Sequence, residues 1–197
     1  VSLAAARANK TPIDWAGYEP PKPKFIGRRE FRNYDLGELA KCIDWGPFFQ
    51  TWDLAGRFPD ILRDEVVGSE AQRVFSDGKR LLHRLIEGRW LQANGVMALL
   101  PANTVDHDSI EVYTDESRSE VALRWSPLRL QTERPVIDGV RRPNRSLADF
   151  IAPKGVKPDY IGLFAVTAGL GVEKKEKQFT DDHDDYSAIM LKALADR

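Results

Sequence analysis

Residues 43–52 have the sequence Ile43-Asp44-Trp45-Gly46-Pro47-Phe48-Phe49-Gln50-Thr51-Trp52. Two tryptophans and two phenylalanines surround one carboxylate, that of Asp44. Gly46 and Pro47 interrupt any helix that reaches this point. A single anion among large apolar rings requires a physical explanation.

Two interpretations of Asp44 stay open at this stage. In the first, the aromatic rings belong to the core and Asp44 caps a helix that begins near Pro47, since Asp is favoured at the N-cap and Pro in the first turn. In the second, the carboxylate lies at a break between two helical segments, in a pocket walled by the rings. Such a pocket suits a ligand with a positive charge, because the carboxylate pairs with the cation while the rings exclude water.

The residues before this stretch predict an arm followed by a helix. Pro12 and the proline-rich residues 20–24 favour extended backbone, so residues 1–32 are expected to form an arm or linker. Asp35 is a plausible N-cap, and apolar residues at helical spacing in 36–43 predict a helix that carries Asp44 at its C-terminal end. A carboxylate at that end gains nothing from the helix dipole, so it is expected to face another partner or solvent.

The residues after it predict helices and a sheet. Apolar residues at helical spacing indicate a helix over 69–87 and another after the acidic run 181–185. Short apolar stretches at 96–100, 110–114 and 121–125 read as strands whose short connectors suit antiparallel neighbours. The continuously apolar stretch 160–167 is expected to be the central strand. These elements indicate an α+β domain over residues 33–197.

The segment 126–158 is broken by prolines, and Pro101 is expected to end the strand before it. Residues 128–133 and 146–150 could each form a short helix. Five arginines are interspersed in this segment, namely Arg129, Arg134, Arg141, Arg142 and Arg145. They form either an anion or partner patch or a solvated connector, and the sequence favours neither.

Composition narrows the class of function. The 29 basic and 30 acidic side chains give a net charge of −1, which argues against a nucleic acid partner. The chain has no apolar run of membrane length and no export signal, and its single cysteine, Cys42, cannot form an internal disulfide. We therefore expect no membrane partner and a cytoplasmic location. The acidic run 181–185 lacks the alternation of a calcium loop, so no metal site and no catalytic residue are assigned.

Six motifs resemble, in this order, the activation domain of cobalamin-dependent methionine synthase: IDWGPFFQTW, DEVVGSEAQRVF, GVMALLPAN, LADFIAPKG, DYIGLFAVTAGL and HDDYSAIMLKALADR. The resemblance extends from about Trp15 to Arg197. It implies a twisted antiparallel β-sheet flanked by helices. It also implies binding of S-adenosylmethionine for the reductive methylation of inactive cob(II)alamin to methylcobalamin. The resemblance further implies that the cobalamin is held by a neighbouring module of the same methyltransferase and that flavodoxin or a flavoprotein reductase supplies the electron.

The resemblance also gives roles to two residues. Asp44 matches the family's aspartate that pairs with the α-amino group of S-adenosylmethionine. Asp196 matches an acidic position on the helix that faces the cobalamin module. The last helix is still amphipathic at Leu194, so we expect the chain to be cut within that helix and the isolated fragment to be inactive. In the family, the remaining ligand contacts come from later residues.

A second hypothesis belongs to a different class of function. The chain could be a non-catalytic docking domain that binds a protein partner through its aromatic cluster and its arginine-rich loop. Substitution of Asp44 separates the two hypotheses, because it removes a ligand contact but leaves a docking surface on residues 129–145 intact.

Overall fold

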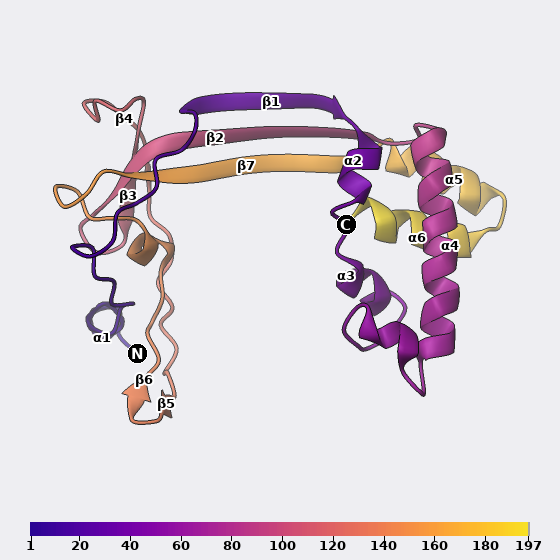
Figure 1. The fold of residues 1–197 in the computed structure, drawn as a ribbon, viewed down its shortest axis with the longest axis horizontal. Helices are drawn as coiled ribbons and strands as arrows, with labels where there is room; N and C mark the ends of the chain where they lie inside the picture. The colour runs from indigo at the N-terminus through magenta and orange to yellow at the C-terminus, as the bar shows by residue number, and fades with distance from the viewer. Residues whose placement is uncertain (197) are drawn as a thin grey trace. The chain divides into compact units, whose positions relative to one another are not determined.

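The computed structural model describes residues 1–196, so the predicted continuation of the last helix through Arg197 lies outside the described residues (Figure 1). The elements follow in the order α1 (Leu3–Ala8), β1 (Gly27–Tyr34), α2 (Leu36–Ala40), α3 (Trp45–Gln50), η1 (Asp60–Arg63), α4 (Gly68–Glu87), β2 (Gln92–Val105), β3 (Ser109–Tyr113), β4 (Val121–Trp125), β5 (Val136–Ile137), β6 (Val140–Arg141), η2 (Leu147–Phe150), β7 (Asp159–Leu170), α5 (Val172–Asp181) and α6 (Asp185–Ala195). The α+β class and the antiparallel sheet with flanking helices are confirmed.

The chain divides into two compact units. Unit 1 consists of Val1–Arg29 and Met97–Phe164, and unit 2 consists of Glu30–Val96 together with the residues from Ala165 onward. The proposed division into an arm over residues 1–32 and a domain over 33–197 stays a prediction. Each unit has its own apolar core, so each is described by itself.

The main sheet has the strand order β1-β2-β3-β4, and β7 pairs with β2. In the antiparallel β2–β3 pair, Ala102 lies opposite Val112 and Val105 lies opposite Ser109. In the β3–β4 pair, Ile110 lies opposite Trp125. The two strands predicted at 110–114 and 121–125 are therefore confirmed as β3 and β4, with the predicted antiparallel pairing.

The predicted ends and centre of the sheet need correction. β2 continues through Pro101 to Val105, because proline adopts extended backbone and the pairing with β3 begins only at Ala102. The central strand is β2, since β7 pairs with β2 alone among the described strands. Phe164 and Val166 of β7 are 79% and 72% exposed. A continuous apolar run therefore did not mark the most buried strand.

The core of unit 2 is built on α4, the helix predicted at 69–87. Its buried side chains include Ala71, Val74, Leu81 and Leu85, and they pack with buried residues of α3 and α6. Gly78, in the middle of α4, lies against the ring of Phe48, because a Cβ atom built there would lie 2.7 Å from Phe48 Cζ. A ring thus occupies the space that a larger residue at this position would need.

The core of unit 1 lies against β2 and β3. Its buried residues are Ala102, Ile110, Val112 and Ala148, with Leu100, Ile151 and Ile161 packed around them. The short helix predicted at 146–150 is confirmed as the 3-10 helix η2, which Ser146 caps by accepting a hydrogen bond from the Ala148 N–H. The one predicted at 128–133 is wrong, since this stretch has no helix and the side chain of Arg129 is engaged in tertiary contacts.

Other differences occur in short elements. Residues 3–8 form α1 instead of extended backbone, since Ser2 caps an alanine-rich stretch. The helix predicted to reach residue 43 ends at Ala40, although Asp35 is its N-cap as predicted. Helix α5 and the β5–β6 hairpin were not predicted. Asp138-Gly139 in the hairpin turn, both with positive φ, is a turn signal that the sequence does contain.

Candidate functional site

Asp44 lies at the N-cap of α3. Its backbone is extended, with φ −84° and ψ 103°, and its Oδ1 accepts a hydrogen bond of 3.0 Å from the Gly46 N–H. Helix α2 has already ended, with Lys41 as its C-cap. The capping interpretation of Asp44 is confirmed, and the expected position at the C-terminal end of the preceding helix is wrong. The chain turns between the two helices before Asp44 begins the second one.

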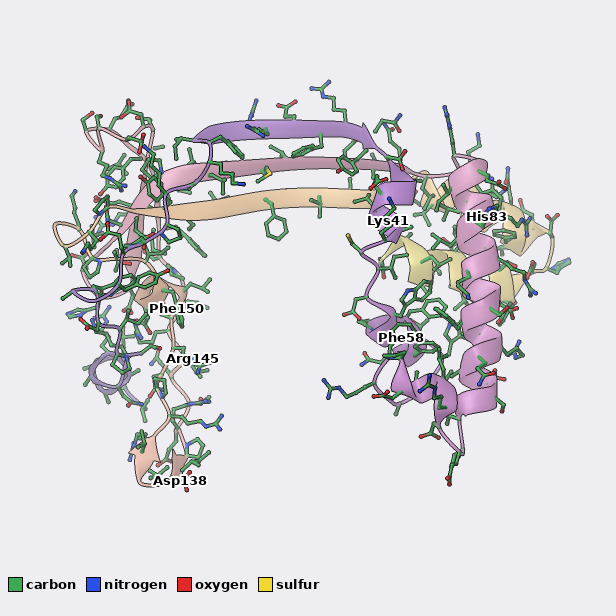
Figure 2. All side chains as sticks on the ribbon, viewed as in Figure 1. Lys41, Phe58, His83, Asp138, Arg145 and Phe150 are labelled. Atoms are coloured by element: carbon green, nitrogen blue, oxygen red, sulfur yellow. The ribbon has the colours of Figure 1, made fainter. Side chains whose placement is uncertain are left out.

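The aromatic rings around Asp44 belong to the core of unit 2. Phe48 and Phe49 are fully buried. Trp45 meets Phe48 edge to face at 5.0 Å between ring centroids and meets Phe75 of α4 in the same way at 4.8 Å. The ring centroid of Phe58, labelled in Figure 2, lies 5.4 Å from that of Phe75. The rings therefore pack on one another instead of lining an open pocket, as the first of the two sequence interpretations requires.

The Asp44 carboxylate itself is exposed to solvent. Its Oδ1 is held by the Gly46 N–H, and its Oδ2 has no protein partner within the described part of the chain. A carboxylate oriented by one backbone donor retains acceptor capacity for a cation or an ammonium group. The chemistry expected for Asp44 is therefore available in the structure, although the rings do not enclose it.

Unit 2 contains a cavity of about 460 Å³ that is lined in part by the residues immediately before Asp44 in the sequence. Cys42 and Ile43, the two residues before Asp44, contribute to its wall together with Leu36, Val166 and Leu194. Its volume is in the range of small-molecule sites, and none of the residues that line it is charged. Sequence reasoning did not find this cavity, because its lining comes from β1, α2, α4, β2, β7 and α6. No local motif marks such an assembly.

Asp196 lies at the end of α6, where it is the C-cap and its backbone N–H donates to the Lys192 carbonyl at 3.1 Å. Its side chain is exposed. A negative charge at a helix C-terminus is unfavourable for the helix dipole. The structure therefore gives Asp196 no evident stabilising role within α6.

The arginine-rich segment contains one arginine that is wholly buried. The side chain of Arg129 is 0% exposed, and all five of its N–H donors have partners. Two of them bond the Asp149 carboxylate at 2.6 and 3.0 Å, and one bonds Asp108 at 2.6 Å. The other two bond the carbonyls of Asn144 and His107. Arg129 is therefore a structural residue and not part of a solvated patch.

Charge pairing in this network shifts the ionisation of its members. The Asp149 carboxylate holds the pKa of Arg129 above its usual value. Burial opposes ionisation of Asp149, but the Arg129 guanidinium and two backbone N–H groups outweigh burial and lower the pKa of Asp149. Asp108 also has a lowered pKa, because Arg7 and Arg129 outweigh its burial. The surroundings of Arg129, Asp149 and Asp108 therefore favour the charged form of each side chain.

The docking hypothesis relied on the aromatic cluster and the arginine-rich loop. The structure buries Phe48, Phe49 and Arg129, so these side chains are not available to a partner. Arg141, Arg142 and Arg145 remain exposed, and Figure 2 labels Arg145 and the hairpin residue Asp138 in unit 1. The docking surface envisaged from the sequence therefore loses the buried rings and Arg129 but keeps three exposed arginines.

Other candidate residues have ordinary structural roles. Asp184 caps α6 by accepting a hydrogen bond from the Ser187 N–H at 3.0 Å, as the helix-start interpretation of the acidic run predicts. His83 is exposed and lies 3.1 Å from Glu87 on the same helix. Cys42 is an exposed free thiol. Within residues 1–196, no helix has both the length and the apolar character that a membrane crossing requires.

Comparisons with known proteins connect this geometry to a family. The family model for the activation domain of vitamin B12-dependent methionine synthase matches residues 35–197. The crystal structure of the MetH reactivation domain bound to AdoHcy is similar, with 47% sequence identity and a TM-score of 0.86. The match covers 100% of this chain and 59% of that chain. The chain thus spans about 59% of the length of the solved domain.

Proposed function

Because the chain belongs to the family of vitamin B12-dependent methionine synthase activation domains, we propose that it binds S-adenosylmethionine and serves the reactivation of cobalamin. The observation that carries this proposal is the likeness to a reactivation domain bound to AdoHcy, at 47% identity over the whole chain. Bound S-adenosylmethionine would supply the methyl group, and flavodoxin or a flavoprotein reductase would supply the one electron, that together return inactive cob(II)alamin to methylcobalamin. The part of this chain is to bind and orient that donor.

Asp44 is the proposed contact to the α-amino group of the ligand. Its carboxylate is exposed, its Oδ1 is oriented by the Gly46 N–H, and its Oδ2 can accept from an ammonium group. This chemistry fits the amino acid portion of S-adenosylmethionine. The adenosyl portion is uncharged and would be bound by other contacts.

We expect Asp44→Asn to weaken S-adenosylmethionine binding by about 10-fold to 100-fold, the usual cost of losing a charge-assisted hydrogen bond. Isothermal titration measures this affinity in the 197-residue chain and in a version extended to the length of the matched domain. Because the chain spans 59% of that domain, the shorter version is expected to bind weakly or not at all.

Asp53→Asn is the matched control, since Asp53 is also exposed and its φ of 56° is one that asparagine tolerates. The Asp53→Asn variant should bind S-adenosylmethionine with the same affinity as the unchanged chain. If Asp44→Asn and Asp53→Asn bind S-adenosylmethionine equally well, Asp44 is not the contact. If no version binds the ligand, the proposed function itself is wrong.

The proposed partners are the cobalamin-binding module of the same enzyme and flavodoxin or a flavoprotein reductase, with the cytoplasm as the location. Asp196 is the proposed contact to the cobalamin module. Its exposed carboxylate at the C-cap of α6 opposes the helix dipole, so helix stability does not account for an acid at this position.

We expect Asp196→Asn to leave the chain as stable or more stable, by up to about 0.5 kcal/mol, and to weaken association with the cobalamin module. Thermal unfolding measures the first effect, and a binding titration with the isolated module measures the second. Asp182→Asn, at the C-cap of α5, removes a carboxylate from an equivalent helix position. Equal module binding by the two variants would show that Asp196 lies outside the interface.

A further inference from the structure

Trp45 is the residue next to Asp44, and its ring is held on two sides. The indole meets Phe48 at 5.0 Å with an interplanar angle of 85° and meets Phe75 at 4.8 Å with an angle of 87°. Phe48 belongs to the same short helix as Trp45, whereas Phe75 belongs to α4. Edge-to-face pairs of this kind each contribute about 0.5–1.5 kcal/mol beyond burial. The first residue of α3 is thereby anchored to α4.

The other partner of Trp45 is anchored as well. Phe48 is fully buried, and its ring lies so close to Gly78 that a Cβ atom there would approach Phe48 Cζ to 2.7 Å. The Phe48 ring is therefore packed directly against the backbone of α4 at Gly78. Trp45 thus contacts two rings, one carried by α4 and one packed against α4.

Asp44 has few restraints of its own. The two residues before it, Cys42 and Ile43, lie outside α2 and α3, and among residues 1–196 the carboxylate accepts one hydrogen bond, from the Gly46 N–H. That donor belongs to the turn which Trp45 begins. The direction of the Asp44 carboxylate thus depends on the orientation of this first turn.

We propose that Trp45 is a positioning residue, which orients the Asp44 carboxylate toward its ligand by fixing the first turn of α3 against α4. The ligand part of this inference rests on the proposed function. Trp45 acts through Asp44 and need not touch the ligand itself. It should therefore affect only ligands that carry the group Asp44 recognises.

The first test needs no ligand. In the 197-residue chain, Trp45→Leu removes both ring contacts, and the Gly46 amide, which donates to Asp44, should exchange with solvent about tenfold faster, equivalent to about 1.4 kcal/mol. Trp45→Phe keeps a ring edge and should restore most of the protection. Trp90→Leu is the matched control, because Trp90 is also half-buried in the core of unit 2 but contacts Phe179 of α5.

The second test compares two ligands in the version extended to the length of the matched domain. S-adenosylmethionine carries the α-amino group, and 5′-methylthioadenosine lacks the amino acid portion. Trp45→Leu should weaken binding of the first about tenfold and leave binding of the second within about twofold. In the Asp44→Asn background, Trp45→Leu should cause no further loss, since both changes remove the same interaction.

The outcomes separate this inference from the proposed function. Unchanged Gly46 exchange in Trp45→Leu overturns the positioning role whether or not any ligand binds. Equal loss of affinity for the two ligands, or loss that adds to that of Asp44→Asn, overturns it as well, because Trp45 would then act on the fold in general. If Trp45→Leu speeds Gly46 exchange in a protein that binds no S-adenosylmethionine, the positioning of Asp44 by Trp45 is supported, and S-adenosylmethionine is not the ligand.

Discussion

Replacing Arg129 by methionine is expected to destabilise the chain by about 3–5 kcal/mol at pH 7. The side chains of Arg129 and Asp149 are 0% and 1% exposed, and that of Asp108 is 13% exposed. Methionine fills much of the arginine volume but leaves the buried Asp149 carboxylate without its cation, while Asp108 keeps its ion pair with Arg7. An uncompensated buried charge is among the most destabilising changes that a single substitution can cause. Lysine would not repair the site, since it cannot make five hydrogen bonds in the fixed plane of the guanidinium.

The loss of stability caused by Arg129→Met should become smaller as pH falls. In the unchanged chain the pKa values of Asp149 and Asp108 are lowered, so their contribution to stability is present above the unfolded value, about 3.9, and disappears as pH falls through the folded values. Without Arg129, burial of Asp149 would dominate and raise its pKa. Protonation would then relieve the buried charge. The difference in stability between the two proteins should therefore narrow as pH falls from 7 toward about 4.

Urea unfolding at pH 7 and at about pH 4 measures both effects. Arg141→Met is the matched control, because Arg141 is an exposed arginine of β6, and its free energy of unfolding should stay within about 0.5 kcal/mol of the unchanged chain. A loss below about 1 kcal/mol for Arg129→Met, or a difference that widens in acid, would show that the buried network does not stabilise unit 1 in the way described.

Arg129 also shows where sequence reasoning reaches its limit. From the sequence it is one of five arginines in a proline-rich segment, and nothing nearby indicates that it is buried. Its acidic partners are Asp108 and Asp149, which are about 20 residues away on either side. Ion pairs of this kind depend on tertiary structure. The sequence can predict an arginine-rich segment but not which of its arginines the fold encloses.

Elements with a strong local pattern were predictable. Helix α4 has apolar residues at helical spacing along its 20 residues. Helix α6 follows an acidic run, and the last acidic residues of that run are favourable at a helix N-terminus. Strands β3 and β4 have short connectors that specify their pairing. Helix α5 has a weaker pattern, with Phe179 as its buried residue, and was missed. The β7 strand was found, but its place in the sheet depends on pairing with β2, which no local pattern encodes.

The candidate site divides in the same way. Capping of a helix by Asp44 follows from residue preferences and was one of the two interpretations that the sequence left open. The role of the rings required the structure, because buried aromatic residues and pocket-lining aromatic residues have the same composition. Trp45, Phe48 and Phe75 come together only when α3 packs on α4. The assignment of Asp44 to a ligand came from the family resemblance and stays a prediction.

Phe48→Ala is expected to destabilise unit 2 by about 3–5 kcal/mol, since the ring is fully buried and its removal leaves a cavity. Gly78→Ala should also destabilise the unchanged chain. The added methyl group would lie 2.7 Å from Phe48 Cζ, and the ring has no exposed side toward which it can move. The helix propensity of alanine, worth up to about 1 kcal/mol over glycine, would not compensate for this clash.

The effect of Gly78→Ala on stability should therefore change sign when Phe48 is replaced by alanine. In the Phe48→Ala background the ring is absent, so Gly78→Ala should stabilise the chain by up to about 1 kcal/mol through helix propensity and partial filling of the cavity. Urea unfolding of the two single variants and the double variant measures the coupling. Additive effects would mean that Phe48 and Gly78 do not touch in solution. The anchoring of α3 on α4 would then lack the Phe48–Gly78 contact and depend on the contact of Trp45 with Phe75.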